Sequence, residues 1–324
     1  MRKKKKRKSG PGAFAFCIVF TCAFFSYFLL APVAGNEKYV IEIERGERLD
    51  AVADKLHAMG AIRSRPMFKV WMYFTWSQNS IKAGEYEIAP RATLHQVKNS
   101  ITSGRMLQRY VTIPEGLTLL QIYDALDMAP DLAGKVEIAV EEGDLLPQTY
   151  AYDRTLTKND VVIKMKEAME RELAREWAER DEGLPIKSPK EAVILASIIE
   201  KETGVPEERP LVASVFVNRL NKGMRLQSDP TVVYTLTKKY GSMGGRKLYR
   251  KDLEIDTPYN TYTRRGLPAG AICNPGIESI RSVLHPPKTD YLYFVAKEGG
   301  GHRFAKTLEE HERNRAEWKN RNNQ

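Results

Sequence analysis

The chain has 324 residues and a formal net charge of +10 at pH 7. Seven of these positive charges come from the Arg and Lys run at residues 2–8, so the remaining chain carries only +3. This pattern argues against a nucleic-acid-binding protein, which needs basic residues spread over its folded part. Cys17 and Cys22 lie in an apolar segment, which leaves Cys273 alone and excludes an intramolecular disulfide in the rest of the chain.

The apolar segment at residues 13–34 has no charged side chain and is long enough to cross a bilayer, which takes about 20 helical residues. Basic residues precede it and acidic residues follow it, so the N-terminus is expected in the cytoplasm and the rest outside. A cleaved signal peptide is the alternative, because Val33, Ala34 and Gly35 are small, but the apolar run exceeds the usual length of about 7–15 residues. We expect a basic cytoplasmic tail at residues 1–12 and a retained single-pass helix in the cytoplasmic membrane.

Three later stretches share one spacing of apolar residues that predicts a strand end, a turn and an amphipathic helix. The three sets are Ile43, Leu49, Val52 and Leu56; Ile88, Leu94, Val97 and Ile101; and Ile113, Leu119, Ile122 and Leu126. The first set, with Gly46 in its turn, resembles a LysM-type glycan-binding module, and we expect a LysM-like α+β subdomain at residues 38–109. A small packing domain that spaces the rest of the chain from the membrane is the alternative. The third set and a short polar join at Gly134–Gly143 are expected to open a second domain at residues 110–324.

Two helices are predicted next. Residues 161–179 carry Met165, Met169, Leu173 and Trp177 at helical spacing, which is typical of a core-facing stripe. Residues 188–204 have Ser188 as N-cap, Pro189 at the first helical position, Glu191 completing a capping box and Gly204 as the stop.

Glu202 is an unusual residue for its position in this helix. It shares a stripe with Leu195, Ile198 and Ile199, and it lies at the C-terminal end of the helix. Burial and the negative end of the helix dipole both raise a carboxyl pKa, so Glu202 is a candidate general acid for glycosidic chemistry. The alternative is a structural ion pair with Arg209, Arg219 or Lys201. Glu200 lies about 140° from this stripe and is expected to be solvated or to support the site indirectly.

Polar and aromatic residues downstream suit a sugar site. A second helix is predicted at about residues 206–222, and Asp229-Pro230 looks like the N-cap and first position of a third. Sugars offer apolar faces and a rim of hydroxyl groups, which aromatic rings, amides and hydroxyls can contact. The substrate-binding candidates are Asn218, Gln227, Ser228, Asp229, Tyr259, Asn260 and Tyr262.

The C-terminal part is predicted to be structural. Residues 291–296 have the composition of a buried strand, and Thr307 and Glu310 form a capping box for a last helix. His302 and His311 lack the spacing of metal ligands, so neither a metal nor another cofactor is expected. His302 is a candidate for the border of a glycan cleft.

Several segments closely resemble the endolytic murein transglycosylases of the YceG-like family. They are ILASIIEKETG, VASVFVNRL, GMRLQSDPTVVY, PYNTYTRRGLPAGAICNPG, HPPKTDYLYFVA and GGHRFAKTLEEH, and they cover most of residues 185–312. The resemblance implies a peptidoglycan-cleaving enzyme whose catalytic glutamate is the second one of EKET, here Glu202. Gln148 departs from the family, in which aspartate is common at that position.

Three functions follow from these observations. The first is a membrane-anchored lytic transglycosylase that acts on glycan strands, especially new ones, beside the peptidoglycan synthases. The second is a muramidase, which would use water and need a partner acid such as Asp229. The third is a glycan-binding scaffold without catalysis. The sequence predicts an α+β fold for all three.

Overall fold

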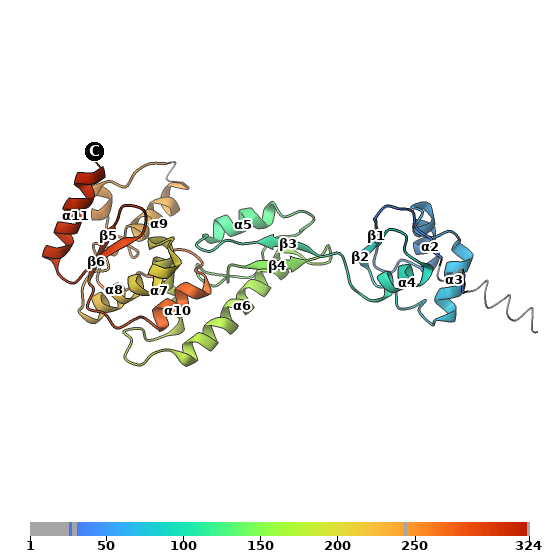
Figure 1. Cartoon of the computed structure of the whole chain (residues 1–324), viewed down its shortest axis with the longest axis horizontal. Helices are drawn as coiled ribbons and strands as arrows, with labels where there is room; N and C mark the ends of the chain where they lie inside the picture. Colours follow the sequence, from blue (N-terminus) through green and yellow to red (C-terminus); the bar gives the residue numbers. More distant parts are fainter. Residues whose placement is uncertain (1–25, 28–30, 243–244, 323–324) are drawn as a thin grey trace, which may run out of the picture. The chain divides into compact units, whose positions relative to one another are not determined.

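The computed structural model describes residues 26–27, 31–242 and 245–322, which form two compact units. The first contains the described residues up to Arg109 together with Asp153–Thr155, and the second contains Tyr110–Tyr152 and the residues from Leu156 on. Both mix helices with short strands, which confirms the predicted α+β class (Figure 1). The predicted tail at residues 1–12 and most of the predicted span at residues 13–34 lie outside the described residues. The predicted end of the span at residue 34 is wrong, because the N–H groups of Val33 and Ala34 donate to the Ala92 carbonyl and Ala34 is buried in the core of the first unit. Among the residues described, no helix combines the length and apolar character needed to cross a membrane.

The first unit contains two copies of the predicted strand–turn–helix pattern. Its elements are β1 (Tyr39–Ile43), α2 (Leu49–Ala58), α3 (Arg65–Phe74), β2 (Gly84–Ile88) and α4 (Leu94–Thr102). β1 and β2 pair antiparallel, with Tyr39 opposite Ile88 and Ile43 opposite Gly84. The repeated apolar positions fill one core: Val52, Leu56, Val97 and Ile101 are fully buried.

The second unit begins with the third copy of that pattern. Its first elements are β3 (Arg109–Thr112), α5 (Leu119–Asp127), β4 (Thr149–Tyr152) and α6 (Lys158–Glu179). β3 pairs with β4, and Ile122 and Leu126 are fully buried beneath them with Met165 of α6. The helix predicted at residues 161–179 is thus confirmed as a core helix, which starts three residues earlier because Thr157 caps it.

A cluster of helices follows and packs around α7. These elements are α7 (Pro189–Glu202), the 3₁₀ turn η1 (Pro206–Glu208), α8 (Arg209–Asn221), α9 (Asp229–Tyr240), the 3₁₀ turn η2 (Arg250–Glu254) and α10 (Ile277–Leu284). Residues 192–199 of α7 are all buried, because α6, α8, α9 and α10 contact it. Only the two ends of α7 are left to present polar side chains.

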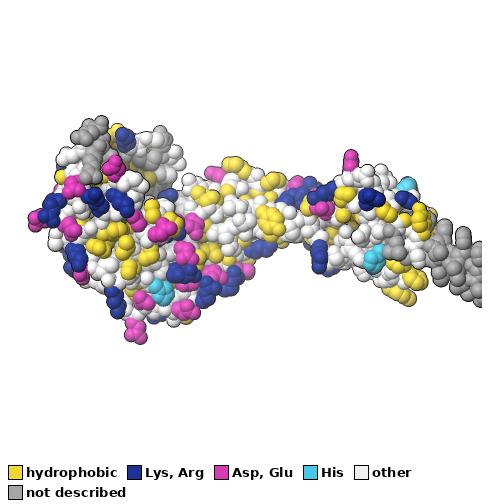
Figure 2. All heavy atoms as spheres, viewed as in Figure 1, with side chains coloured by type: hydrophobic (Ala, Val, Ile, Leu, Met, Phe, Trp, Pro, Cys, Tyr) yellow, Lys and Arg dark blue, Asp and Glu magenta, His cyan; other side chains and the backbone are white. Residues whose placement is uncertain are grey.

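The chain then forms a hairpin and a last helix: β5 (Tyr293–Ala296), β6 (His302–Ala305) and α11 (Leu308–Asn322). The expectation of a buried strand at residues 291–296 is wrong in part, because β5 is only half-buried. In the described part of the chain it pairs with β6 alone, with Tyr293 opposite Ala305. On the face drawn in Figure 2, basic and acidic side chains are interspersed over the second unit, so this face shows no large field of one sign.

Candidate active site

The sequence of α7 fixes where Glu202 lies. Ser188 caps the helix by accepting the Glu191 N–H at 3.2 Å, and Pro189 takes the first position. The Glu191 carboxylate accepts the N–H of Lys187 at 2.7 Å instead of that of Ser188, so the predicted capping box is only half formed. The backbone becomes extended at Thr203, one residue before Gly204, where the helix was predicted to stop. Glu202 is therefore the last helical residue, half-buried at the end of an apolar helix.

The Glu202 carboxylate has one hydrogen-bond partner in the described part of the chain. Ser228 donates its hydroxyl to Oε1 at 2.5 Å. The cations that sequence offered as ion-pair partners bind elsewhere: Lys201 donates to the carbonyl of Gly116, and Arg219 to the carbonyl of Leu292. A structural ion pair is therefore not what holds Glu202 in place.

These surroundings change the protonation of Glu202. Burial is the largest effect and raises its pKa to about 7. The Ser228 hydrogen bond and the charge of Arg219 act in the opposite direction, and the nearby charge of Asp229 adds to the rise. Near neutral pH, both the acid and the carboxylate forms are populated, which suits a group that must donate a proton and later accept one.

A ladder of hydroxyl groups positions Ser228. The Thr261 hydroxyl accepts the Ser228 N–H at 2.9 Å and lies 3.0 Å from the Thr231 hydroxyl, which donates to the Ser228 carbonyl at 2.7 Å. Gln227, just before, has the left-handed φ of +52°, which is uncommon outside glycine. The N-cap of α9 is Ser228 and not Asp229 as expected, so the residue that starts the helix also contacts Glu202.

A second acid, Asp229, lies beside this contact. Tyr262 donates its hydroxyl to Asp229 Oδ1 at 2.5 Å. Burial, the hydrogen bond to Asp229 and the charges of Asp229 and Glu202 all raise the pKa of Tyr262, so it stays a hydrogen-bond donor. The structure thus brings four predicted site residues together: Glu202, Ser228, Asp229 and Tyr262.

The other predicted substrate-binding residues have different surroundings. Asn218 donates its amide to the carbonyls of Thr289 and Tyr291, which ties α8 to the C-terminal segment. Asn260 is buried and donates to the carbonyls of Leu253 and Ile255, so it holds its own loop. Gln227 is exposed next to Ser228.

Tyr259 lies against Tyr234, with ring centroids 5.1 Å apart. It does not contact Glu202 through any described hydrogen bond; it lines a separate cavity with Glu142. Sequence reasoning treated the segment around Glu142 as a polar join and missed this residue, as it missed Thr231 and Thr261. No local pattern marks them, because their contacts come from other parts of the chain.

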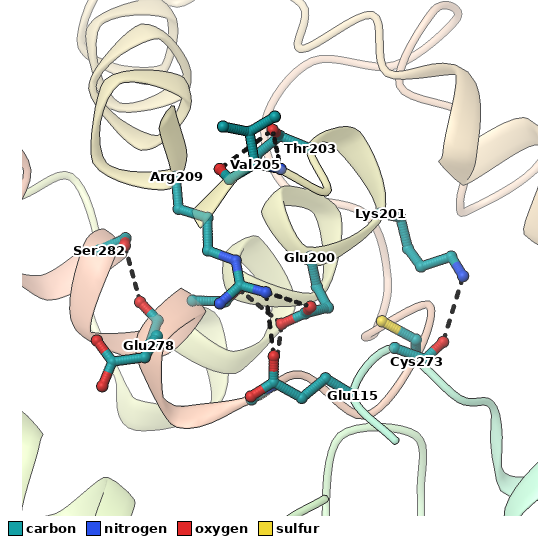
Figure 3. A network of polar contacts seen from close by, with 12 residues as sticks. Glu115, Glu200, Lys201, Thr203, Val205, Arg209, Cys273, Glu278 and Ser282 are labelled. Atoms are coloured by element: carbon teal, nitrogen blue, oxygen red, sulfur yellow. Dashed lines mark hydrogen bonds and ion pairs between the residues drawn. The ribbon is translucent and has the colours of Figure 1, made fainter. Parts of the chain in front are cut away.

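The structure shows that Glu200 is not solvated, and its indirect support of the site stays a prediction. Its side chain is 6% exposed and pairs with Arg209 at 3.1 Å. Its other oxygen accepts the Gly276 N–H at 3.0 Å and the Ser279 hydroxyl at 2.7 Å, which fixes the start of α10. Arg209 also binds Glu115 at 3.0 Å, as the polar network in Figure 3 shows.

The histidines of the C-terminal part are engaged in packing contacts. His302 lies 2.8 Å from Glu208, and His311 stacks on Tyr293 with ring centroids 5.2 Å apart. In the described ranges, no group of three His, Cys, Asp or Glu side chains is arranged to hold a metal ion. The place of His302 beside a glycan remains a prediction.

Together, these elements define an α+β protein in which a half-buried glutamate with a raised pKa, Glu202, lies beside a second carboxyl group, Asp229. The chain belongs to the YceG-like family, whose sequence profile matches residues 41–317. The endolytic murein transglycosylase of Bacillus subtilis is 33% identical over 87% of this chain and 86% of its own length. That of Streptococcus pneumoniae D39 is 27% identical over 89% of this chain, which spans 60% of that relative. The crystal structure of a YceG-like protein from Listeria monocytogenes is 32% identical and covers 86% of this chain and 99% of its own, with a TM-score of 0.52.

Proposed function

We propose that this protein is an endolytic lytic transglycosylase of peptidoglycan. It would cleave the bond between N-acetylmuramic acid and N-acetylglucosamine and leave 1,6-anhydro-N-acetylmuramic acid ends. The observation that carries the proposal is Glu202, a carboxyl group with a pKa of about 7 and one neutral hydroxyl partner. The names of the Bacillus and Streptococcus relatives support the choice of substrate.

The proposed reaction uses Glu202 twice. As the acid, it protonates the glycosidic oxygen, so the bond to C1 of muramic acid breaks and the glucosamine hydroxyl leaves. As the carboxylate, it removes the proton of the C6 hydroxyl, whose oxygen then bonds to C1 and closes the 1,6-anhydro ring. The internal hydroxyl replaces water because it is held next to C1. Glu202 ends protonated, ready for the next cycle.

The neighbouring residues have supporting roles in this scheme. Ser228 orients the Glu202 carboxylate, and Asp229 stabilises positive charge that develops at C1, with Tyr262 holding Asp229 in place. Gln227 is exposed beside Ser228 and is available to a sugar hydroxyl. Asn218, Tyr259 and Asn260 shape the surrounding loops.

A muramidase is the second candidate, and Asp229 is the observation that favours it. An exposed carboxylate next to the acid is what a hydrolytic glycosidase uses to activate water or to attack C1. The non-catalytic scaffold has no comparable support, since a scaffold does not require a carboxyl group held with a raised pKa.

The test is digestion of purified sacculi by the wild-type protein and by Glu202→Gln, followed by mass analysis of the sugar ends. We expect anhydro ends from the wild type and no products from the variant. Reducing ends would select the muramidase, and unchanged cleavage by Glu202→Gln would contradict the role of Glu202.

We also propose that the apolar segment at residues 13–30, which ends before Ala34 joins the core of the first unit, anchors the protein in the cytoplasmic membrane, with the catalytic unit outside beside the synthases that supply new strands. The charge asymmetry around this segment supports this topology. A reporter fused after Gln324 should be active only outside the membrane, and activity in the cytoplasm would contradict the topology.

The first unit is proposed to bind glycan as a LysM-like module. It has a core of its own, which includes Ala34, and its exposed rings include Trp76, Tyr73 and Phe74, which could lie on sugar faces. A fragment of residues 31–109 should fold and sediment with purified sacculi. A folded fragment that stays in solution would favour a spacer.

A further inference from the structure

A cavity of about 660 Å³ lies in the second unit, and none of the four residues around Glu202 lines it. Its walls come from the N-terminus of α5, the loop at residues 140–144, α6, the first half of α7, the second half of α9 and the segment at residues 259–271. The proposed reaction at Glu202 does not use this cavity.

One wall of the cavity carries the carboxyl group of Glu142, which a network of hydrogen bonds holds in place. Glu142 Oε2 accepts the Leu119 N–H at 3.0 Å and the Asn274 amide at 3.2 Å. Asn274 is fully buried, and its amide oxygen accepts the Gly143 N–H at 3.0 Å. Gly143 has a φ of +93°, and an added Cβ would lie 2.6 Å from Val193. Only glycine fits there, so the loop that presents Glu142 is fixed against α7.

The protonation of Glu142 resembles that of Glu202. Burial raises its pKa to about 7, while the Leu119 N–H, Lys238, Tyr234 and Asn274 act in the opposite direction. A carboxyl group in this range can accept a hydrogen bond or donate one near neutral pH. Because Glu142 lies in a cavity wall, either its acid form or its carboxylate form can contact a ligand.

The cavity lining also offers a cation over two aromatic rings, and its charge acts on Glu142. Lys238 Nζ lies 5.9 Å from the Tyr234 ring and 5.8 Å from the Tyr259 ring. Lys238 is exposed and has no acidic side chain within ion-pair distance in the described residues, whereas Lys190 at the same cavity pairs with Glu141 at 2.8 Å. The ammonium group of Lys238 is therefore available to an anionic ligand.

The rest of the lining combines apolar and charged groups. The apolar members that matter here are Leu119, Leu120, Val140, Met169, Leu173 and Val193. Leu120 is 71% exposed, which leaves apolar surface available to a ligand. A neutral sugar can accept a hydrogen bond from Lys238 but cannot form an ion pair with it, so the lining favours a ligand with charges and small apolar groups.

The cavity and the site around Glu202 share two helices. α7 contributes Ile194 to the cavity and Glu202 to the site, and α9 contributes Tyr234 to the cavity and starts beside the site. Eight helical residues separate Ile194 from Glu202, which is about 12 Å along the axis. Four extended peptide residues cover about 13–14 Å, so a peptide joined to a sugar at Glu202 is long enough to reach the cavity.

We propose that this cavity binds the peptide stem carried by muramic acid, an inference that rests on the proposed peptidoglycan substrate. Lys238 pairs with a carboxylate of the stem, Glu142 contacts its amide or amine groups, and the apolar wall receives its alanine methyl groups. The catalytic unit thus recognises peptide-bearing strands in preference to bare glycan.

Direct binding tests the site without catalysis. The probe is the tetrapeptide L-Ala-γ-D-Glu-L-Lys-D-Ala, titrated by calorimetry into the full chain carrying Glu202→Gln. We expect saturable binding that Lys238→Ala weakens about tenfold, the loss of one charge-assisted contact. Lys239→Ala, the adjacent exposed lysine outside the cavity, is the matched control and should leave the affinity unchanged. No saturable binding, or equal effects of the two variants, would overturn the proposal.

Kinetics on two substrates separate this inference from the proposed function. Wild-type protein should show a lower KM for peptide-bearing strands than for strands stripped by an amidase, and Lys238→Ala should remove this difference. Equal KM values for the two substrates would overturn the inference while the cleavage activity stands. If neither substrate is cleaved but the tetrapeptide binds through Lys238, the proposed function fails and the peptide site stands. Binding of a peptide-free disaccharide that depends on Lys238 would replace the peptide with a sugar.

Discussion

The two faces of α7 show how one helix can hold two glutamates for opposite purposes. Glu200 and Glu202 are two residues apart, a rotation of about 200°, so they face different parts of the molecule. Glu200 is surrounded by donors: the Arg209 side chain, which Figure 3 shows, the Gly276 N–H and the Ser279 hydroxyl. Glu202 has only the Ser228 hydroxyl in the described residues, and burial raises its pKa to about 7.

The two glutamates differ more in the number of hydrogen-bond donors around their carboxyl groups than in burial. A buried carboxylate with a guanidinium and two further donors is held as a structural tie, because removing any partner leaves an uncompensated charge. A half-buried carboxyl group with one neutral partner is free to gain and lose a proton. The account predicts that Glu200 matters for stability and Glu202 for catalysis.

The largest effect is expected from Glu202→Gln. The amide keeps the shape of the side chain but transfers no proton, so the cleavage rate should fall by about 10² to 10⁴-fold or more, since the same group serves both steps. The measurement is the release of soluble fragments from sacculi at matched concentrations of folded protein. Glu207→Gln, an exposed glutamate just beyond the helix, is the control and should keep the wild-type rate.

The next effect is expected from Glu200→Ala. Removing one partner of a buried ion pair costs about 3–5 kcal/mol, and here it also leaves the Gly276 N–H and Ser279 without their acceptor. Urea unfolding should show this loss in the free energy of unfolding, with the rate per folded molecule changed far less than by Glu202→Gln. An inactive variant with wild-type stability would reverse the roles given to the two residues.

A smaller effect is expected on the pH dependence of stability. The folded-state pKa values of Glu202 and Glu142 are about 7, above the ordinary value of 4.5. The folded state therefore binds more protons than the unfolded state between these values, and this contribution to stability is present below about pH 4.5 and lost as the pH rises through about 7. Urea midpoints at pH 5 and pH 8 should differ less in Glu202→Gln and Glu142→Gln than in the wild type. Unchanged differences in both variants would show that neither group has a raised pKa.

The smallest effect is expected from Ser228→Ala. The Ser228 hydroxyl lowers the pKa of Glu202, so its loss should raise that pKa further and move the pH–rate profile to higher pH. Activity should fall less than in Glu202→Gln, because the acid itself is retained. A lower rate with an unmoved pH profile would mean that Ser228 contacts the substrate and not Glu202.

Sequence predicted the elements whose signals are local. Ser188 and Pro189 mark the start of α7, and the stripe of Leu195, Ile198 and Ile199 is buried as predicted, although the other residues at 192–199 are buried as well. The repeated apolar spacings predicted an amphipathic helix after each turn, and α2, α4 and α5 are those helices, beginning at Leu49, Leu94 and Leu119. These features depend on helix periodicity and capping, which a single stretch of chain contains.

The sequence did not predict which residues from other segments pack against the predicted elements. The helical angle of Glu200 follows from its position, but its partners Arg209, Gly276 and Ser279 are between 9 and 79 residues away. Glu142 depends likewise on Asn274, 132 residues later. Such contacts are set by tertiary packing, and no spacing rule for one chain segment contains them.

The most direct test of the central claim is cleavage of sacculi in water enriched in oxygen-18, with mass analysis of the new muramic acid ends. If Glu202 uses the C6 hydroxyl as the nucleophile, the new ends are anhydro sugars that carry no heavy oxygen. Reducing ends that each carry one oxygen-18 would show that water attacks C1 and would contradict the account.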